Sequence, residues 1–286
     1  MGIRTAISEN YQNLSGTLRA AADYLASHQL DVATRSLRSI ATASGISPAS
    51  YSRLARALGY DSYEDLREQA RGEIERKSEL FPVKARQLQD DMASPGTIPL
   101  LERQVAACRD NVGALANDIE VKKLERAADR LSAASKVVVI GALSSLAIAE
   151  YLVYMVNWFK SGWTVAGRNG GTLGSDLIRL KPEDAVIIIS KSPYALRSVR
   201  AAQIASQRGA CVVAITDSHV FPGLADADFG FVTLVESPQF FTSYAATVVL
   251  IETLVGMLVE RAGPSAEATI RETAAQNREL EQYVEG

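Results

Sequence analysis

Residues 137–141 read Val-Val-Val-Ile-Gly, and the same kind of run returns as Ala-Val-Ile-Ile-Ile at 185–189 and Cys-Val-Val-Ala-Ile at 211–215. Each run is continuously apolar rather than alternating, which indicates a strand that is buried on both faces. Shorter runs at 164–166 and 229–234 extend the series, and helical stretches lie between most of them. This order predicts a parallel sheet with helices on both faces, a three-layer α/β sandwich of the flavodoxin-like kind.

The chain before this sheet reads as an all-α domain. A short helix fits residues 37–44, with Ser36 as its N-cap and Gly45 at its end. A second helix begins at Ser47-Pro48, with serine at the cap and proline at the first helical position, and it ends at Gly59. Two short helices joined by such a turn match the spacing of a helix-turn-helix.

The link between the two regions is expected to be helical. The charge-dense residues 61–86 are predicted to form a helix that breaks at Pro82, and the turn formers in 92–99 mark a boundary. A long helical pattern then returns from 100 to 134. We therefore divide the chain into a helix-turn-helix domain, a helical linker and an α/β domain, at residues 1–80, 81–112 and 113–286.

Composition places the chain among globular proteins. Of its 286 residues 47% are hydrophobic and 22% charged, which excludes a wholly disordered chain, a collagen-like repeat and a disulfide scaffold. The two cysteines, Cys108 and Cys211, are expected to be reduced packing residues, since no CxxC motif is present. His28 and His219 are too few and too isolated for a histidine metal site, so we expect no metal. We also expect no cofactor and no catalytic residues.

No segment reads as a membrane anchor or an export signal. The stretch from 242 to 259 approaches spanning length, but it carries Glu252 and two threonines and lacks aromatic or basic flanks. We read it as a buried helix. The N-terminus has no apolar core of signal-peptide length, which favours a cytoplasmic protein without a membrane partner.

Positive charge is concentrated in the first part of the chain. Residues 1–60 hold six basic residues against three acidic ones, whereas the whole chain has a net charge of −3. No acidic residue lies between Arg35 and Arg56. A basic island on an acidic protein favours a local contact with a polyanion.

The helix after Ser47 carries this charge on one side. Counted at about 100° per residue from Arg53, Ser50 and Arg56 fall near +60° and −60°, while Leu54 and Leu58 fall on the opposite arc. Small polar side chains allow a close approach to the DNA major groove, and arginine reaches guanine edges or phosphates. The alternative is a solvated amphipathic helix in an ordinary bundle. The residues expected to contact DNA are Ser36, Arg38, Ser47, Ser50, Ser52, Arg53 and Arg56.

Residues 38–66, RSIATASGISPASYSRLARALGYDSYEDL, resemble the helix-turn-helix of RpiR-type bacterial transcription regulators. The likeness lies in a helix, Ser47, a helix with Arg53, then Leu58-Gly59-Tyr60 and a fourth helix with aromatic residues, and it extends over about residues 1–80. It implies a winged or four-helix variant of the motif whose third helix reads operator DNA.

Two strand-to-helix turns of the α/β region are candidates for anion binding. Ile-Gly-Ala-Leu-Ser-Ser at 140–145 and Ile-Ser-Lys-Ser-Pro-Tyr at 189–194 each follow a predicted strand and enter a helix. Ligands bind α/β sheets at the carboxyl ends of strands, and hydroxyl groups beside a helix N-terminus suit an anion. The alternative is that the serines are simple helix caps.

Residues 137–260 resemble the SIS (sugar isomerase) domain, which follows the helix-turn-helix in RpiR regulators. The likeness rests on 137–141, Ser145, 189–192, and 214–218 preceding 225–228. It implies that a sugar or phosphosugar-related metabolite binds here. The implied ligand-binding residues are Gly141, Ser144, Ser145, Ser190, Ser192 and Glu236.

The chain departs from the SIS pattern at three positions. The family usually has Gly-x-Gly-x-Ser in the first loop and Ser-x-Ser-Gly-x-Thr in the second. Leu143 replaces the second glycine, Pro193 replaces the glycine of the second loop, and Ala195 stands where threonine donates a hydroxyl. Proline lacks an N–H donor, and leucine is expected to narrow the space beside the backbone. The sequence therefore favours an altered ligand preference.

Three functions fit these features. The first is a transcription regulator that binds operator DNA and a small effector as a homodimer or homotetramer. The second is a phosphosugar aldose-ketose isomerase, for which Glu150 and Glu236 are the acids nearest the expected pocket. The third is a SIS scaffold that binds no ligand. The fused helix-turn-helix favours the regulator.

Overall fold

The computed structural model describes residues 3–27, 32–33, 35–93, 96–168 and 170–282. The chain divides into two compact units, Met1–Pro95 and Gly96–Gly286. The helical unit and the α/β unit each have a hydrophobic core of their own. His28 and residues 94–95 of the expected boundary lie outside the described residues.

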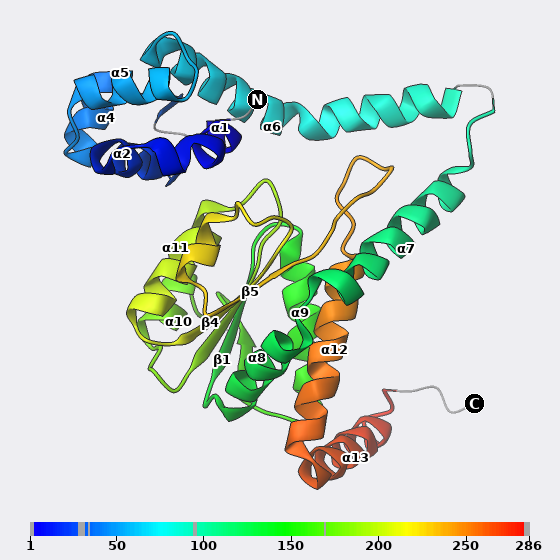
Figure 1. Ribbon diagram of the computed structural model, residues 1–286. Coiled ribbons are helices and arrows are strands. Elements are labelled where there is room, and N and C mark those ends of the chain that lie inside the picture. The colour runs from blue at the N-terminus through cyan, green and yellow to red at the C-terminus, as the bar shows by residue number, and fades with distance from the viewer. Residues whose placement is uncertain (1–2, 28–31, 34, 94–95, 169, 283–286) are drawn as a thin grey trace. The chain divides into compact units, whose positions relative to one another are not determined.

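The first unit is helical, as predicted. Its core contains Tyr51, Leu54 and Leu66, which are fully buried and come from consecutive helices. The two short helices expected at 37–44 and after Ser47 are confirmed. In order, its described elements are α1 (Ile3–Asn10), the 3₁₀ helix η1 (Tyr11–Asn13), α2 (Gly16–Ser27), α4 (Leu37–Ser44), α5 (Pro48–Ala57) and α6 (Tyr63–Ala93) (Figure 1).

The predicted helix break at Pro82 is wrong, because α6 continues through that residue to Ala93. Proline removes one backbone hydrogen bond and crowds the preceding turn, at a cost of about 3 kcal/mol in a helix interior. Pro82 is exposed, so water can bond to the freed carbonyl group. The many remaining bonds of this 31-residue helix carry it past the proline.

The second unit is a five-stranded parallel sheet in the order β2-β1-β3-β4-β5. Its strands are β1 (Val137–Gly141), β2 (Trp163–Val165), β3 (Ala185–Ile189), β4 (Cys211–Thr216) and β5 (Phe229–Val232). Its helices are α7 (Leu100–Asp118), α8 (Val121–Ala133), α9 (Ser145–Val156), α10 (Leu173–Ile178), α11 (Leu196–Gln207), the 3₁₀ helix η2 (Pro222–Asp226), α12 (Ala245–Ala262) and α13 (Pro264–Glu279).

Helices cover both faces of this sheet, which confirms the predicted three-layer sandwich (Figure 1). Val137 and Val139 face the layer of α8, α9 and α12, whereas Val138 and Ile140 face α10 and α11. All four valine and isoleucine side chains are at most 3% exposed. This two-sided burial explains why the strands read as continuous apolar runs.

The stretch predicted as a buried helix at 242–259 is largely α12. Leu250, Ile251 and Leu254 belong to the core, while Glu252 points to solvent. No helix in the described part of the chain has the length and hydropathy needed to cross a membrane.

The strand register brings the two predicted binding turns to one edge of the sheet. Gly141 pairs with Ile189, and Ile189 pairs with Ile215. The β1–α9 turn, the β3–α11 turn and the residues after β4 therefore leave the sheet at the same level, which is the usual position of ligand sites in α/β folds.

Gly141→Ala is expected to destabilise the α/β unit. A Cβ atom at residue 141 would lie 2.3 Å from the carbonyl oxygen of Ser145, a backbone atom that cannot move aside cheaply. We expect a loss of about 1–3 kcal/mol or more in unfolding free energy. Urea unfolding followed by tryptophan fluorescence measures it, because both tryptophans, Trp158 and Trp163, lie in this unit.

Gly113→Ala is the matched control. Gly113 lies inside α7, and no atom comes within 4 Å of the position that a Cβ would take there, so alanine should raise stability by up to about 1 kcal/mol. Equal stability of Gly141→Ala and the wild type would contradict the assigned role of Gly141.

Candidate functional site

The helix-turn-helix is fixed by side-chain caps at both helix starts. Ser36 Oγ accepts a hydrogen bond from the Ser39 backbone N–H at 3.3 Å, and Ser47 Oγ accepts one from the Ser50 N–H at 3.2 Å. Between the helices, Gly45 has φ +70°, a conformation that glycine adopts without a steric cost. The caps and this glycine determine how α5 follows α4.

The exposed face of α5 carries Arg53 and Arg56, whereas Tyr51 and Leu54 on its other face are fully buried. The sequence placed Ser50 on the exposed arc, and this placement is wrong, since Ser50 is only 3% exposed. Its hydroxyl lies 3.0 Å from Ser47 Oγ and accepts a bond from Arg53 Nη2 at 3.4 Å. Ser50 therefore orients Arg53 from beneath.

The other predicted DNA-contacting residues lie on the outer surface of the same motif. Ser36, Arg38 and Ser47 are exposed, and Ser52 is half-buried with its hydroxyl donated to the Pro48 carbonyl at 3.2 Å. A shallow hollow at the start of α4 brings Arg38 together with Arg35, Ser36 and Ser39. Sequence reasoning left out Arg35, although the acid-free stretch begins there.

Gly141 and Leu143 shape the turn between β1 and α9. Gly141 packs directly against the first turn of α9, where no Cβ would fit. Leu143 has φ +55°, in the left-handed region where glycine is the usual residue. Its side chain is 67% exposed and lines neither cavity of the α/β unit described below. The expectation that Leu143 narrows the pocket is thus wrong. The cost of leucine at this position lies in its left-handed backbone conformation.

The two serines of this turn are bonded within the protein. Ser144 Oγ and Ser145 Oγ each lie 2.9 Å from the phenol oxygen of Tyr244, which immediately precedes α12. A phenol donates one hydrogen bond and accepts others, so both contacts can exist together. Sequence reasoning did not include Tyr244.

The β3–α11 turn is held by an acid from the neighbouring strand end. The Ser192 N–H donates to Asp217 Oδ2 at 3.0 Å, and Ser190 is buried with its N–H donated to the Ile215 carbonyl at 3.0 Å. Burial, followed by the nearby charge of Asp217, raises the pKa of Tyr194 above its ordinary value. The backbone donor that a phosphate loop would offer to an anion is therefore occupied by Asp217.

Lys191, between the two serines, points into the protein. Its side chain is 6% exposed, and Nζ donates to the Thr216 carbonyl at 2.8 Å and to Thr233 Oγ1 at 2.6 Å. The Thr233 hydroxyl lies 2.8 Å from that of Thr247 on α12. Burial lowers the pKa of Lys191 to about 7, although the Asp217 carboxylate opposes this shift.

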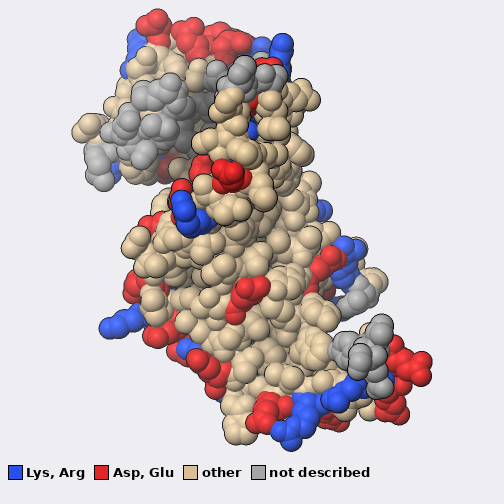
Figure 2. Space-filling model, turned by 90° about the vertical axis from the view of Figure 1, so that its right-hand side faces the viewer, with Lys and Arg blue, Asp and Glu red and all other residues tan. Residues whose placement is uncertain are grey.

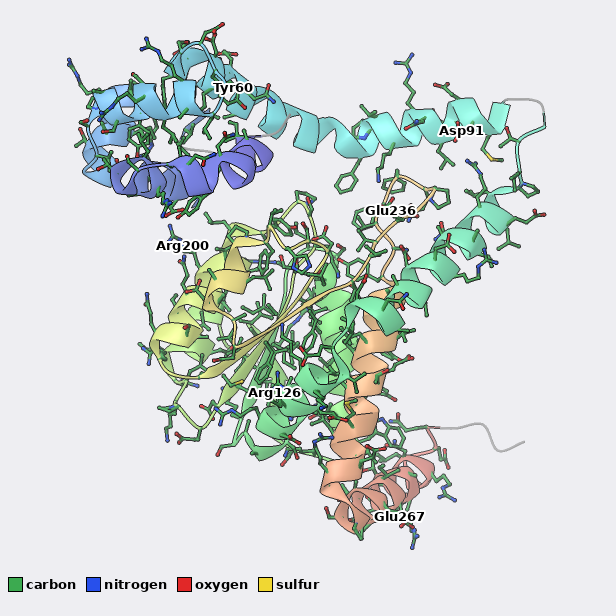
Figure 3. The ribbon with its side chains drawn as sticks, in the orientation of Figure 1. Tyr60, Asp91, Arg126, Arg200, Glu236 and Glu267 are labelled. Carbon is green, nitrogen blue, oxygen red and sulfur yellow. The ribbon has the colours of Figure 1, made fainter. Side chains whose placement is uncertain are left out.

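The two glutamates considered for proton transfer do not lie together in this site. Glu236 is exposed on the loop between β5 and α12, where the Asn111 side chain bonds to its backbone N–H and carbonyl (Figure 3). Glu150 lies on α9 and forms an ion pair with Arg168 at 2.6 Å. Of the predicted ligand residues, the structure brings Gly141, Ser144, Ser145, Ser190 and Ser192 to the sheet edge and places Glu236 on this separate loop.

Two cavities open near the carboxyl ends of the strands. One, of about 380 Å³, lies beside Gly141 and is lined by Arg168, Thr172 and Arg197 together with apolar side chains. The other, of about 550 Å³, lies beyond β4 and β5 and is lined by Asp217, His219 and Lys123 among others. Among the described residues, no group of three histidine, cysteine or acidic side chains could hold a metal ion.

A helix-turn-helix followed by a SIS domain defines the class of this protein. The helix-turn-helix domain of the rpiR family matches residues 1–77, and the SIS domain matches residues 130–257. The chain therefore carries a helix-turn-helix domain of the rpiR family followed by a SIS domain.

Individual relatives agree with this assignment. The sugar isomerase domain of an RpiR transcription factor from Sphaerobacter thermophilus is 27% identical with a TM-score of 0.58, covering 62% of this chain and 98% of its own. The Vibrio vulnificus NanR protein complexed with ManNAc-6P shares the fold, with a TM-score of 0.59 at 22% identity over 98% of this chain and 99% of its own.

A curated relative extends beyond this chain. The bifunctional protein glk of Paraburkholderia xenovorans strain LB400 is 26% identical over 289 residues, which cover 97% of this chain and 43% of that protein. The chain thus spans less than half the length of this relative.

Lys191 is expected to make the stability of the α/β unit depend on pH. An unfolded lysine keeps its proton up to about pH 10, whereas folded Lys191 loses it above about pH 7. The unfolded state therefore binds more protons between these values, and the contribution of Lys191 to unfolding free energy rises with pH across that window. Below about pH 7 the burial of its charge opposes folding in full.

Lys191→Met tests this dependence in urea unfolding at pH 6, 7, 8 and 9. The wild type should gain stability relative to the variant as pH rises, because methionine has no proton to lose. Lys181→Met, at an exposed lysine beside Glu183, is the control and should show a constant difference. A constant difference for Lys191→Met as well would contradict the prediction.

Proposed function

We propose that this protein is a sequence-specific DNA-binding transcriptional regulator controlled by a small metabolite bound in its SIS domain. The observation that carries the proposal is the two-sided nature of α5. Its apolar face is fully buried in the helical core, while Arg53 and Arg56 project from a capped helix on the other side. A recognition helix needs this division to enter the major groove.

The α5 side chains have distinct roles in this proposal. Arg53, supported by Ser50, reads base edges, and the exposed Ser47 and half-buried Ser52 border the groove. Arg56 and the hollow at the start of α4, with Arg35, Ser36 and Arg38, contact phosphates. Phosphate contacts fix the register, and base contacts give specificity.

The domain assignment remains part of the proposal. We assign DNA binding to residues 1–80, a helical linker to 81–112 and effector binding with oligomerisation to 113–286. Operator DNA and reduced thiols at Cys108 and Cys211 fit a cytoplasmic protein, and both cysteines are free.

The effector is proposed to be a sugar or phosphosugar-related metabolite. NanR, which shares the fold, is complexed with ManNAc-6P in its solved structure. The ligand is proposed to bind at the sheet edge where the predicted residues Gly141, Ser144, Ser145, Ser190 and Ser192 lie. An isomerase is less well supported, because Glu150 is paired with Arg168 and Glu236 lies on a separate loop.

The protein is further proposed to act as a homodimer or homotetramer, since one helix-turn-helix contacts few base pairs. An aromatic area on α9 supports an interface there. Tyr154 is 63% exposed and stacks edge-on against Trp158, and Tyr151 donates to Glu252 of α12 at 2.7 Å. Figure 2 shows few charged side chains on the face that carries α12 and more toward α13.

Arg53→Ala is expected to weaken binding to a selected operator by about 1–3 kcal/mol and to relax sequence preference. Arg56→Ala should weaken binding to all DNA sequences alike and lower the slope of log K against log salt concentration by about one, the value of one lost phosphate contact. The operator would be selected with the wild-type protein from random duplexes, and affinities measured by fluorescence anisotropy at several salt concentrations.

Arg71→Ala is the control for this pair, because Arg71 lies on α6 and bonds to Glu68 at 2.9 Å. Full operator affinity in Arg53→Ala would remove α5 from the interface. Failure of the wild type to select any sequence would contradict the proposed function itself.

Tyr154→Arg is expected to convert the assembly to a smaller species at micromolar concentration, because a charge would be buried unpaired in the interface. Sedimentation velocity measures the change. Ile178→Arg is the matched control, since Ile178 is equally exposed at 64% but lies on α10 in the opposite layer. An unchanged sedimentation coefficient for Tyr154→Arg would exclude α9 from the interface.

A further inference from the structure

The usual anion position of the SIS edge is occupied by the protein's own groups. Asp217 accepts the Ser192 N–H, Tyr244 lies against both serine hydroxyls of the first turn, and Lys191 is directed away into the core. A carboxylate beside the second turn also repels a phosphate group. An anionic ligand therefore needs cationic donors elsewhere on this edge.

The cavity beside Gly141 provides two such donors from separate elements. Arg168 comes from the loop between β2 and α10, and Arg197 comes from the first turn of α11. The Arg197 side chain has no hydrogen bond or ion pair to any residue that the structure describes. The remaining wall includes the Thr172 hydroxyl and the apolar side chains of Ile140 and Leu146.

The loop that carries Arg168 is held in place by its own hydrogen bonds. Gly167 has φ +70°, and its N–H donates to Asp176 Oδ2 at 2.8 Å. Thr172 and Ser175 form a reciprocal cap at the start of α10. These bonds fix Gly167, which precedes Arg168, and the start of α10.

The ion pair between Arg168 and Glu150 is weak enough for a ligand to replace it. Its partner Glu150 is 48% exposed and Arg168 itself 50%, and exposed ion pairs of this kind contribute little to stability. A ligand anion can replace the Glu150 carboxylate on Arg168 at small cost. Glu150 therefore acts as an internal competitor for the site.

We propose that this cavity binds the anionic group of a small acidic metabolite between Arg168 and Arg197, with the carbon skeleton against Ile140 and Leu146. The anionic group is a phosphate monoester or a carboxylate, both of which arginine binds through paired N–H donors. A cavity of about 380 Å³ accommodates a ligand of metabolite size. This inference rests on the proposed function and specifies where its effector binds.

Isothermal titration calorimetry of the full chain tests the site with matched probes: inorganic phosphate, glucose 6-phosphate, gluconate and neutral glucose. At least one anionic probe should bind, and glucose should bind more weakly than either charged sugar derivative. Preference for glucose 6-phosphate over gluconate identifies a phosphate ligand, and the reverse order identifies a carboxylate.

Substitutions assign the binding to the two arginines. Arg168→Gln and Arg197→Gln should each lower the affinity for the anionic probe about ten-fold or more. Arg200→Gln is the matched control, because Arg200 lies on the same helix, bonds to Gln203 at 3.1 Å and is outside the cavity (Figure 3). Glu150→Gln should tighten binding about two- to five-fold by freeing Arg168, which a purely structural role would not produce.

Three results would overturn the inference. One is unchanged probe affinity in both arginine variants, a second is weakening by Arg200→Gln to the same extent, and a third is no binding of any anionic probe at 10 mM. If the wild type still selects operator DNA, only the inference fails. If arginine-dependent probe binding occurs in a protein that selects no DNA, the site stands and the proposed function fails.

Discussion

The arrangement of the sheet's carboxyl edge depends on one buried lysine side chain. Lys191 leaves β3 and bonds to the end of β4 through Thr216 and to Thr233 just after β5, and Thr233 continues this chain of bonds to Thr247 of α12. A buried amine without these partners would be costly, so the side chain keeps three strand ends and a helix in register. Because the Lys191 side chain is bonded inside the protein, the turn that carries it offers a ligand only the groups on its outer surface.

The fold follows from the sequence because its determinants are local. Alternate residues of Val137–Ile140 face opposite layers, and both layers are apolar, so the run itself contains the information about burial. The helix starts at Ser36 and Ser47 are equally local, because the cap and its N–H donor lie three residues apart. The break predicted at Pro82 is wrong, since a single lost bond in a long exposed helix is too small a cost to end it.

The site was only partly predictable because its decisive contacts join distant segments. A helical projection gives the direction of Ser50 but not its depth, which is set by packing on the rest of the helical unit. The loop serines were found from their place after strands, but Asp217 and Tyr244, which bond to those loops, come from 25 and about 100 residues further along the chain. Arg168 and Arg197 belong to different elements, and nothing in their spacing indicates that they border one cavity.

The three departures from the SIS loop pattern are not equivalent. Leu143 keeps a left-handed backbone although it is not glycine, so the path of the turn is imposed by its surroundings, including the close packing of Gly141 on α9. The Leu143 side chain lies in solvent and removes no hydrogen-bond donor from the edge. The cost of leucine here is the strain of its left-handed backbone, about 1–2 kcal/mol. Pro193 and Ala195, by contrast, remove donors in the turn where Asp217 already occupies the Ser192 N–H. Restoring glycine at 143 would relieve strain without changing what the edge can bind. The second turn, by contrast, cannot bind an anion while its Ser192 N–H is bonded to Asp217. Asp217 therefore closes the β3–α11 turn to an anion, and the cationic side chains that line the cavity beside Gly141 are Arg168 from the loop between β2 and α10 and Arg197 from the first turn of α11.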